Sequence, residues 1–284
     1  MYFLCGNIFI KFGGITLRQV ALGYKTCLIP LSIKKLKMLQ EVGIEGIYVV
    51  HAKYGYEIHE QRINDIFSKL NLDYEFVTDG DVSNFTRALL KKYFCDQIET
   101  VLSKGVLSCT LNHIFCYEKI VRNKNKYALV FENDPFFLGD FVEKIKRVAT
   151  EANNLEPGFI ISLENSTFKF PALRKIKKGK YLYEASYGRM AGAYLIDQKA
   201  AKDILESLKT EKCCQVIDWW HNTLIDHNII RMYWAHPPFV EQGSHNGRMS
   251  STISSKDKGN MRRLRWNVQK FYKMYIYRWF GGER

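Results

Sequence analysis

Two carboxylates at the end of an apolar run have the spacing that metal-ion chemistry needs. Residues 126–131 are mostly apolar and predict a buried strand, which ends at Glu132, with Asp134 two positions later. In an extended backbone, side chains at positions i and i+2 point to the same side, so both carboxylates can converge on one point. Carboxylate oxygens are preferred ligands of Mg²⁺ and Mn²⁺. The sequence therefore predicts a divalent-cation site, the alternative being that the strand simply ends in solvated acids.

The elements before this strand have the pattern of a nucleotide-binding half-sheet. Residues 46–51 and 74–77 are apolar and predict two buried strands. Between them, residues 57–70 carry apolar side chains at the i, i+3, i+4, i+7 spacing of an amphipathic helix. Open α/β sheets bind ligands just beyond the carboxyl ends of such strands. The predicted carboxylate pair lies at that kind of position.

Strands and helices continue to alternate along the rest of the chain. A helix over 106–121 is apolar nearly all round, which is typical of a buried helix. Asp197 can cap a later helix by accepting backbone N–H bonds. The other predicted elements are a mostly helical segment over 84–104, a surface helix over 139–151, strands over 159–163 and 191–196, and a basic inserted hairpin or loop over 164–184. This order predicts an α/β fold with a mainly parallel central sheet and helices on both faces.

Charge divides the chain into three predicted parts. The net charge is +13, and 46% of the 284 residues are hydrophobic, enough for one large domain. Residues 1–37 hold six basic residues and no acid, so we expect a basic N-terminal extension, poorly ordered in the simplest interpretation, and Met38 could be the natural start. Residues 38–255 are neutral overall and form the predicted α/β domain. This neutral body argues against a nucleic-acid-binding core.

The third part, residues 256–284, predicts a basic aromatic amphipathic helix. It holds nine basic residues against two acids. Its apolar stripe, spaced by three and four positions, consists of Leu264, Val268, Phe271, Tyr275 and Trp279. Such a helix suits an anionic membrane surface. The alternative is a terminal helix packed on the domain with solvated basic flanks. Nucleic acid is a weaker alternative because no nucleic-acid-binding motif appears.

Cysteine use and hydropathy indicate the compartment. The seven cysteines are an odd number without Cys-x-x-Cys spacing, which predicts reduced thiols in a cytosolic protein. No run approaches the roughly 18 apolar residues of a spanning helix, and the first residues are a poor signal peptide. We therefore expect a cytoplasmic protein, peripheral on the inner face of the plasma membrane.

Several ordered segments resemble one known family. Residues 105–113 (Gly-Val-Leu-Ser-Cys-Thr-Leu-Asn-His) resemble the Gly-x-x-Gly-Cys-x-Leu-Ser-His segment of glycosyltransferase family 25, the bacterial lipooligosaccharide galactosyltransferase group. The family's next strand ends in Glu-Asp-Asp, where this chain has Glu-Asn-Asp at 132–134. Further similar segments are 192–201, 216–218 and 237–242, followed by Ser251 and Ile253. The resemblance covers residues 46–253, and its departures are Ser108, Asn112 and Asn133.

This resemblance implies a GT-A type fold and inverting transfer of a hexose from a nucleotide sugar. The expected reaction transfers galactose from UDP-galactose to a cell-envelope glycan such as lipopolysaccharide or lipooligosaccharide. Glu132 and Asp134 would hold Mn²⁺ or Mg²⁺, which stabilises the leaving diphosphate. His245 is a candidate third ligand, or else an exposed loop histidine. The other function that the residues allow is a non-catalytic sugar- or lipid-binding adaptor that retains the fold.

Inversion needs a base that takes the proton of the acceptor hydroxyl. Asp218 is the candidate, because Trp219 and Trp220 beside it could offer flat apolar faces to sugar rings. The alternative roles for Asp218 are a helix cap or a contact with the ligand.

The remaining candidates would bind the donor. Arg62 lies near the family's basic residues after the first strand, and Asp79 and Asp81 could meet the ribose or the base, or simply form a turn. His113 lies on an apolar helix face, where a core histidine is the more common outcome. The full set of predicted donor-binding residues is His51, Arg62, Asp79, Asp81, His113 and Gln242.

Overall fold

The computed structural model describes residues 9–12, 15–18, 38–249 and 260–277. The chain forms two compact units, Met1–Leu31 and Ser32–Arg284. In the first unit, strands β1 (Phe9–Phe12) and β2 (Ile15–Arg18) pair antiparallel. Both strands belong to the predicted N-terminal extension, and the rest of residues 1–37 lies outside the described ranges, as does the stripe residue Trp279.

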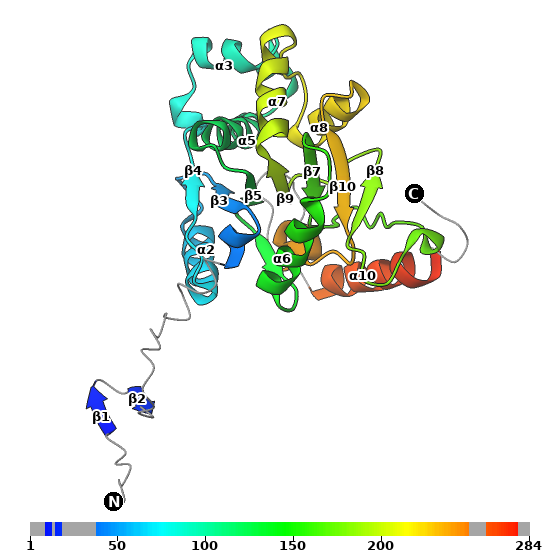
Figure 1. Ribbon diagram of the computed structural model, residues 1–284. Helices are drawn as coiled ribbons and strands as arrows, with labels where there is room; N and C mark the ends of the chain where they lie inside the picture. Colours follow the sequence, from blue (N-terminus) through cyan, green and yellow to red (C-terminus); the bar gives the residue numbers. More distant parts are fainter. Residues whose placement is uncertain (1–8, 13–14, 19–37, 250–259, 278–284) are drawn as a thin grey trace, which may run out of the picture. The chain divides into compact units, whose positions relative to one another are not determined.

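The second unit is built on a seven-stranded sheet in the order β4-β3-β5-β9-β7-β10-β8 (Figure 1). Its strands are β3 (Ile44–Val50), β4 (Glu75–Val77), β5 (Tyr127–Glu132), β7 (Phe159–Ser162), β8 (Leu182–Ala185), β9 (Ala193–Asp197) and β10 (Arg231–Ala235). Only β9 and β8 run against the other strands. The predicted mainly parallel sheet is confirmed. The interpretation of 164–184 as an inserted hairpin or loop was partly wrong, because its end enters this sheet as edge strand β8, paired with β10.

Helices cover both faces of the sheet, as the alternating pattern predicted. Figure 1 shows α2 and α6 on one face and α3, α5, α7 and α8 on the other. Their bounds are α2 (Glu57–Leu70), α3 (Arg87–Tyr93), α4 (Ile98–Val101), α5 (Lys104–Asn123), α6 (Phe141–Ala152), α7 (Gln198–Thr210) and α8 (Ile217–Asp226). Helix α5 is buried along most of its length because it lies between the sheet and helices α7 and α8. Two hydrophobic cores result, one on each face of the sheet.

Short elements complete the unit around the carboxyl end of β5. Strands β6 (Pro135–Phe137) and β11 (Val240–Gln242) form an antiparallel pair, and α9 (Gly243–Asn246) follows directly. The 3₁₀ turns are η1 (Val82–Asn84) and η2 (Leu173–Lys175). Because β4 and β5 lie on opposite sides of β3, the strand order reverses between β3 and β5. The crevice outside such a reversal point is where open α/β sheets bind ligands.

Helix α10 (Asn260–Phe271), continued by the π-helical turn η3 (Tyr272–Ile276), packs on the domain through one face only. Trp266 is buried, its ring centroid 4.3 Å from that of Phe168. On the same side Arg262 donates to the backbone oxygen of Ser244, and Lys270 pairs with Glu241. The stripe residues Leu264, Val268, Phe271 and Tyr275 are 57–60% exposed. Within the described part of the chain, no helix combines the length and apolar character needed to cross a membrane.

The side chain of Asp197 links the start of helix α7 to the start of strand β7, and its removal tests how much these hydrogen bonds stabilise the fold. Its Oδ1 accepts from the N–H groups of Ala200 (3.0 Å) and Phe159 (2.9 Å), and Oδ2 accepts from Gly158 (2.8 Å). This confirms the predicted cap of α7. We expect Asp197→Ala to lower the free energy of unfolding by about 3 kcal/mol, because a cap is lost and buried donors become unpaired.

Urea denaturation of purified protein measures this change. The control is Asp203→Ala, which removes only the i,i+4 pair with Lys199 on the same helix and should cost no more than about 0.5 kcal/mol. Equal losses in the two variants would contradict the anchoring role.

Candidate active site

A cavity of about 260 Å³ opens outside the carboxyl ends of β3 and β5. It lies at the reversal point of the strand order, where a ligand site is expected. Residues from five segments contribute to its wall, including His51, Asp81, Cys109, Glu132, Asp134 and Ser244. The fold thus brings together four of the residues that the sequence nominated for a donor or a metal.

Both carboxylates of the predicted pair face this cavity, as the i, i+2 geometry predicted. Oδ2 of Asp134 accepts from the N–H of Ser244 at 2.7 Å, while its buried Oδ1 has no hydrogen-bond partner among the described residues. Burial raises the pKa of Glu132 and of Asp134, and for Asp134 the charge of Glu132 adds to the effect. His245, in α9, acts against both shifts and therefore lies within electrostatic range.

Two departures from the family motif hold the neighbouring loops together. The amide of Asn133 lies 3.3 Å from Nδ1 of His51, on the loop after β3, and both residues line the same cavity as the carboxylate pair. Asn112 donates to the backbone oxygen of His51 (3.3 Å) and accepts from the N–H of Gly80 (2.7 Å). Burial lowers the pKa of His51, so a neutral ring can accept the Asn133 amide at Nδ1. The replacement of the central acid therefore leaves both outer carboxylates directed at the cavity.

The other predicted donor-binding residues divide into two groups. Asp81 is 6% exposed, lines the cavity and accepts from the N–H of Lys53 at 3.0 Å. Arg62 and Asp79 are not among the described residues that line it. Arg62 donates to the backbone oxygen of Pro135, directly after Asp134, so it supports the carboxylate loop. Asp79 is exposed and pairs with Lys119 at 3.2 Å.

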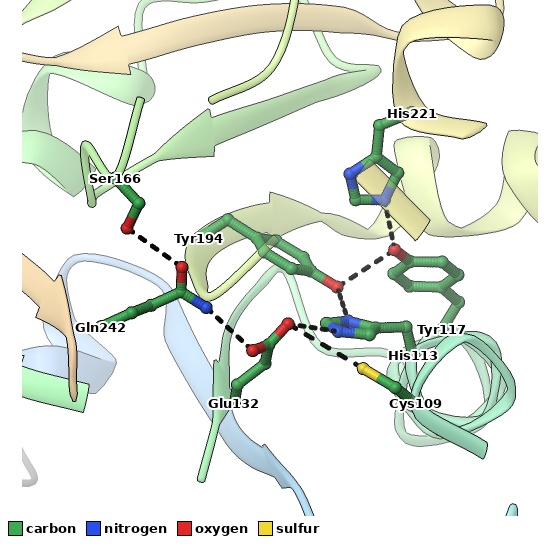
Figure 2. Close-up of polar contacts among 8 residues, drawn as sticks. All are labelled: Cys109, His113, Tyr117, Glu132, Ser166, Tyr194, His221 and Gln242. Atoms are coloured by element: carbon green, nitrogen blue, oxygen red, sulfur yellow. Dashed lines mark hydrogen bonds and ion pairs between the residues drawn. The ribbon is translucent and has the colours of Figure 1, made fainter. Parts of the chain in front are cut away.

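Gln242 lies behind the carboxylates, where Figure 2 shows it between Glu132 and Ser166. Its Nε2 donates to Oε2 of Glu132 at 2.8 Å, and its Oε1 accepts from the hydroxyl of Ser166 at 3.0 Å. A side chain at Gly192 would lie 2.2 Å from the Gln242 amide, so the close approach requires glycine there. Gln242 therefore orients Glu132 from a buried position.

A chain of buried polar groups continues on the other side of Glu132 (Figure 2). Nδ1 of His113 lies 2.8 Å from the hydroxyl of Tyr194, which lies 3.0 Å from that of Tyr117. The Tyr117 hydroxyl in turn lies 2.6 Å from Nε2 of His221. Burial lowers the pKa of both histidines to about 3, so both rings are neutral at physiological pH. His113 is thus a core histidine that also faces Glu132, at 3.8 Å.

Sequence reasoning missed Tyr117, Tyr194, His221 and Ser166. The two tyrosines lie inside segments whose apolar pattern indicated only core positions. The available signal was the hydroxyl itself, because a buried tyrosine usually finds a hydrogen-bond partner.

Asp218 lies in the first turn of α8, whose N-cap residue is Val216. Burial raises the pKa of Asp218, and the charge of Glu132 adds to this, while the N–H of Trp219 and His113 oppose it. The carboxylate is therefore close enough to interact electrostatically with Glu132 and His113, although Asp218 is not among the described residues that line the cavity. The suggestion that both tryptophans face a sugar was wrong for Trp220, which is 5% exposed, whereas Trp219 is 67% exposed.

Among the described residues, one group of three potential metal ligands has its ligand atoms within 4.8 Å of one another. It consists of Cys109, His113 and Glu132. Asp134 and His245 do not belong to this group. Asp134 lines the same cavity as Glu132, and the charge of His245 lowers the pKa of Glu132. None of the described cysteines forms a disulfide.

Comparison with known proteins agrees with this architecture. Residues 57–218, more than half of the chain, match glycosyltransferase family 25 (LPS biosynthesis protein), and the chain belongs to this family. It is 22% identical over 239 residues to a glycosyltransferase 25 family member of Aedes aegypti, covering 76% of this chain and 39% of that protein. It is 24% identical over 164 residues to the lipooligosaccharide biosynthesis protein lic2B of Haemophilus influenzae, covering 55% of this chain and 61% of that protein. The chain thus spans less than two thirds of these relatives, and its α/β architecture is that of a GT-A-like nucleotide-sugar transferase.

Proposed function

We propose that the protein transfers a hexose from a nucleotide sugar to a glycan of lipopolysaccharide or lipooligosaccharide synthesis. One observation carries this proposal: two carboxylates, the partly buried Glu132 and the buried Asp134, converge on a cavity at the reversal point of the sheet. Membership of family 25 supports a glycosyl transfer reaction, and the name of lic2B supports lipooligosaccharide as the acceptor class. UDP-galactose is the proposed donor.

The residues of the cavity fit a hard divalent cation. Oδ1 of Asp134 is buried without a hydrogen-bond partner among the described residues, and both carboxylates have raised pKa values that a nearby positive charge would lower. Glu132 and Asp134 would hold Mn²⁺ or Mg²⁺, and His245, whose charge would lower the pKa of both carboxylates, is the candidate third ligand. When bound, such an ion stabilises the charge that develops on the leaving diphosphate. His51 and Asp81, which line the same cavity, would contact the nucleotide.

Asp218 is the proposed base of an inverting displacement. It would accept the proton of the acceptor hydroxyl, and its raised pKa strengthens it as a base. Trp219, exposed on the same turn, would offer its ring to the acceptor sugar. The adaptor alternative has no specific observation in its favour, since the replaced residues Asn112 and Asn133 support the site rather than dismantle it.

Nucleotide release from a panel of nucleotide sugars tests the proposal. Purified protein with Mn²⁺ and a lipooligosaccharide acceptor should release nucleotide fastest from UDP-galactose, and chelation of the metal should stop release. Binding of a nucleotide sugar without any release would favour the adaptor instead. Release that continues unchanged in the presence of chelator would contradict the metal-dependent reaction.

We further propose that the exposed face of α10 and η3 binds an anionic membrane. The apolar stripe is directed away from the domain, because the opposite face is occupied by Trp266 and its neighbours. Exposed or partly exposed cations flank the stripe, namely Arg263, Arg265 and Lys273. An apolar face with a basic rim suits the surface of a bilayer that contains anionic lipid. This position would hold the enzyme at a glycolipid acceptor on the cytoplasmic face of the inner membrane.

Vesicle flotation tests this surface. The triple variant Leu264→Ser, Val268→Ser, Phe271→Ser should lose most flotation with phosphatidylglycerol vesicles, while native protein floats with them and not with neutral phosphatidylcholine. High salt should weaken native binding in part, because each basic residue near the surface contributes about 1 kcal/mol. The matched control replaces Ile58 and Val101, which are 79% and 72% exposed elsewhere, by serine. Native-like flotation of the triple variant would refute the assignment, as would equally salt-sensitive retention on random DNA.

A further inference from the structure

Cys109 and His113 lie one helical turn apart on α5 and meet Glu132 at the end of β5 (Figure 2). Their i,i+4 spacing places both side chains on the same helix face. Sγ of Cys109 lies 3.9 Å and Nε2 of His113 lies 3.8 Å from Oε1 of Glu132. A thiol, an imidazole and a carboxylate thus converge on one point from two rigid elements.

The nitrogen of His113 that faces this point is buried and lacks a hydrogen bond. His113 is fully buried, and its Nε2 has no hydrogen-bond partner among the described residues. The tyrosine chain behind it can fix the tautomer. If Tyr117 donates to His221, then Tyr194 donates to Tyr117 and Nδ1–H of His113 donates to Tyr194. The lone pair of Nε2 is then directed toward Cys109 and Glu132, as metal coordination requires.

We propose that Cys109, His113 and Glu132 form a binding site for a thiophilic divalent ion of the zinc class. Sulfur, imidazole and carboxylate ligands together select such an ion over Mg²⁺ or Mn²⁺. Cys109 and Glu132 line the cavity, so a fourth position would remain open to water or to a ligand. On binding, the thiol of Cys109 forms its bond to the ion and releases its proton to solvent.

The surroundings of the three ligands resemble the outer shell of a metal site. Ligating histidines usually donate their second ring nitrogen to a neighbour, and ligating carboxylates are hydrogen-bonded in turn. Here Nδ1 of His113 lies 2.8 Å from the hydroxyl of Tyr194, which accepts from it in the tautomer derived above, and the amide of Gln242 donates to the other oxygen of Glu132 at 2.8 Å. The site goes beyond the proposed transfer reaction and does not depend on it. Because Glu132 is shared, the zinc-class ion and the proposed Mn²⁺ should compete.

Cobalt spectroscopy of the reduced protein, residues 1–284, tests the site. One equivalent of Co²⁺ should give the visible bands of four-coordinate cobalt and a near-ultraviolet thiolate-to-cobalt band, both lost on addition of Zn²⁺. Cys109→Ser should abolish the near-ultraviolet band. The control is Cys214→Ser, an exposed thiol, which should keep the band at full intensity. A band that persists in Cys109→Ser, or native protein without one, would overturn the proposal.

Two further measurements distinguish this site from the proposed Mn²⁺ site at Glu132 and Asp134. Asp134→Asn should keep the thiolate band but weaken Mn²⁺ binding measured by electron paramagnetic resonance, and Cys109→Ser should do the reverse. If the Cys109→Ser variant is unstable, an alkylation experiment on the native protein takes the place of the variant. Zn²⁺ should then protect Cys109, but not Cys214, from iodoacetamide, as mass spectrometry of the peptides would show. Equal protection of both thiols, or of neither, would contradict the site.

Discussion

Asp134→Asn should remove nearly all nucleotide-sugar turnover while leaving the protein folded. The substitution keeps the size of the side chain, and its amide oxygen can still accept from Ser244. The substitution removes the negative charge of the carboxylate, whose buried oxygen Oδ1 is proposed to bind the cation. Loss of even an outer-shell partner costs about 10–100-fold in metal affinity or activity, so loss of a ligand should cost more than about 100-fold.

Nucleotide release at saturating donor, with Mn²⁺ varied, measures the effect. Asp140→Asn provides the control, because Asp140 is an exposed cap of α6 and asparagine caps equally well. The control should turn over like the native protein, with the same melting temperature. An Asp134→Asn enzyme that retained turnover within about threefold of native would remove this aspartate from the metal site, since ligand loss should cost far more.

Asp218→Asn should lower turnover by about 10²–10⁴-fold if Asp218 is the base, because general-base catalysis contributes that much. Donor affinity should change little, since the side chain does not line the cavity among the described residues. Asparagine can still accept the backbone N–H bonds of the first turn of α8, so helix stability is preserved. Native-like turnover in a folded variant would leave Asp218 with a helix-terminal role only.

The pH profile provides a second measurement of the same residue. A base must be ionised, and burial together with Glu132 raises the pKa of Asp218. Turnover should therefore be full above this raised pKa and should fall as the pH drops through it, at higher pH than for a solvated aspartate. Saturating Mn²⁺ should be present, because it competes with protons at Glu132 and Asp134. The acidic fall should disappear from the residual turnover of Asp218→Asn.

Local sequence patterns determined the first helix and strands of the domain and one half of the site. The apolar spacing of residues 57–70 predicted α2 with its observed bounds, and the apolar run before Glu132 predicted β5. The i, i+2 rule correctly directed Glu132 and Asp134 to one cavity. These predictions succeeded because helix and strand periodicity, and the alternation of side chains along a strand, are properties of the local backbone.

Only the tertiary structure decided which distant side chains meet these carboxylates. Gln242 and Asp134 are brought together by the pairing of β11 with β6, and His113 reaches Glu132 because α5 packs across the sheet. No local pattern could distinguish Arg62 and Asp79, which lie outside the lining of the cavity, from Asp81, which lies within it. The stripe on α10 likewise remained exposed because Trp266 occupies the packed face instead. Periodicity identifies an apolar face, but only contacts between elements far apart in the sequence determine which face is buried.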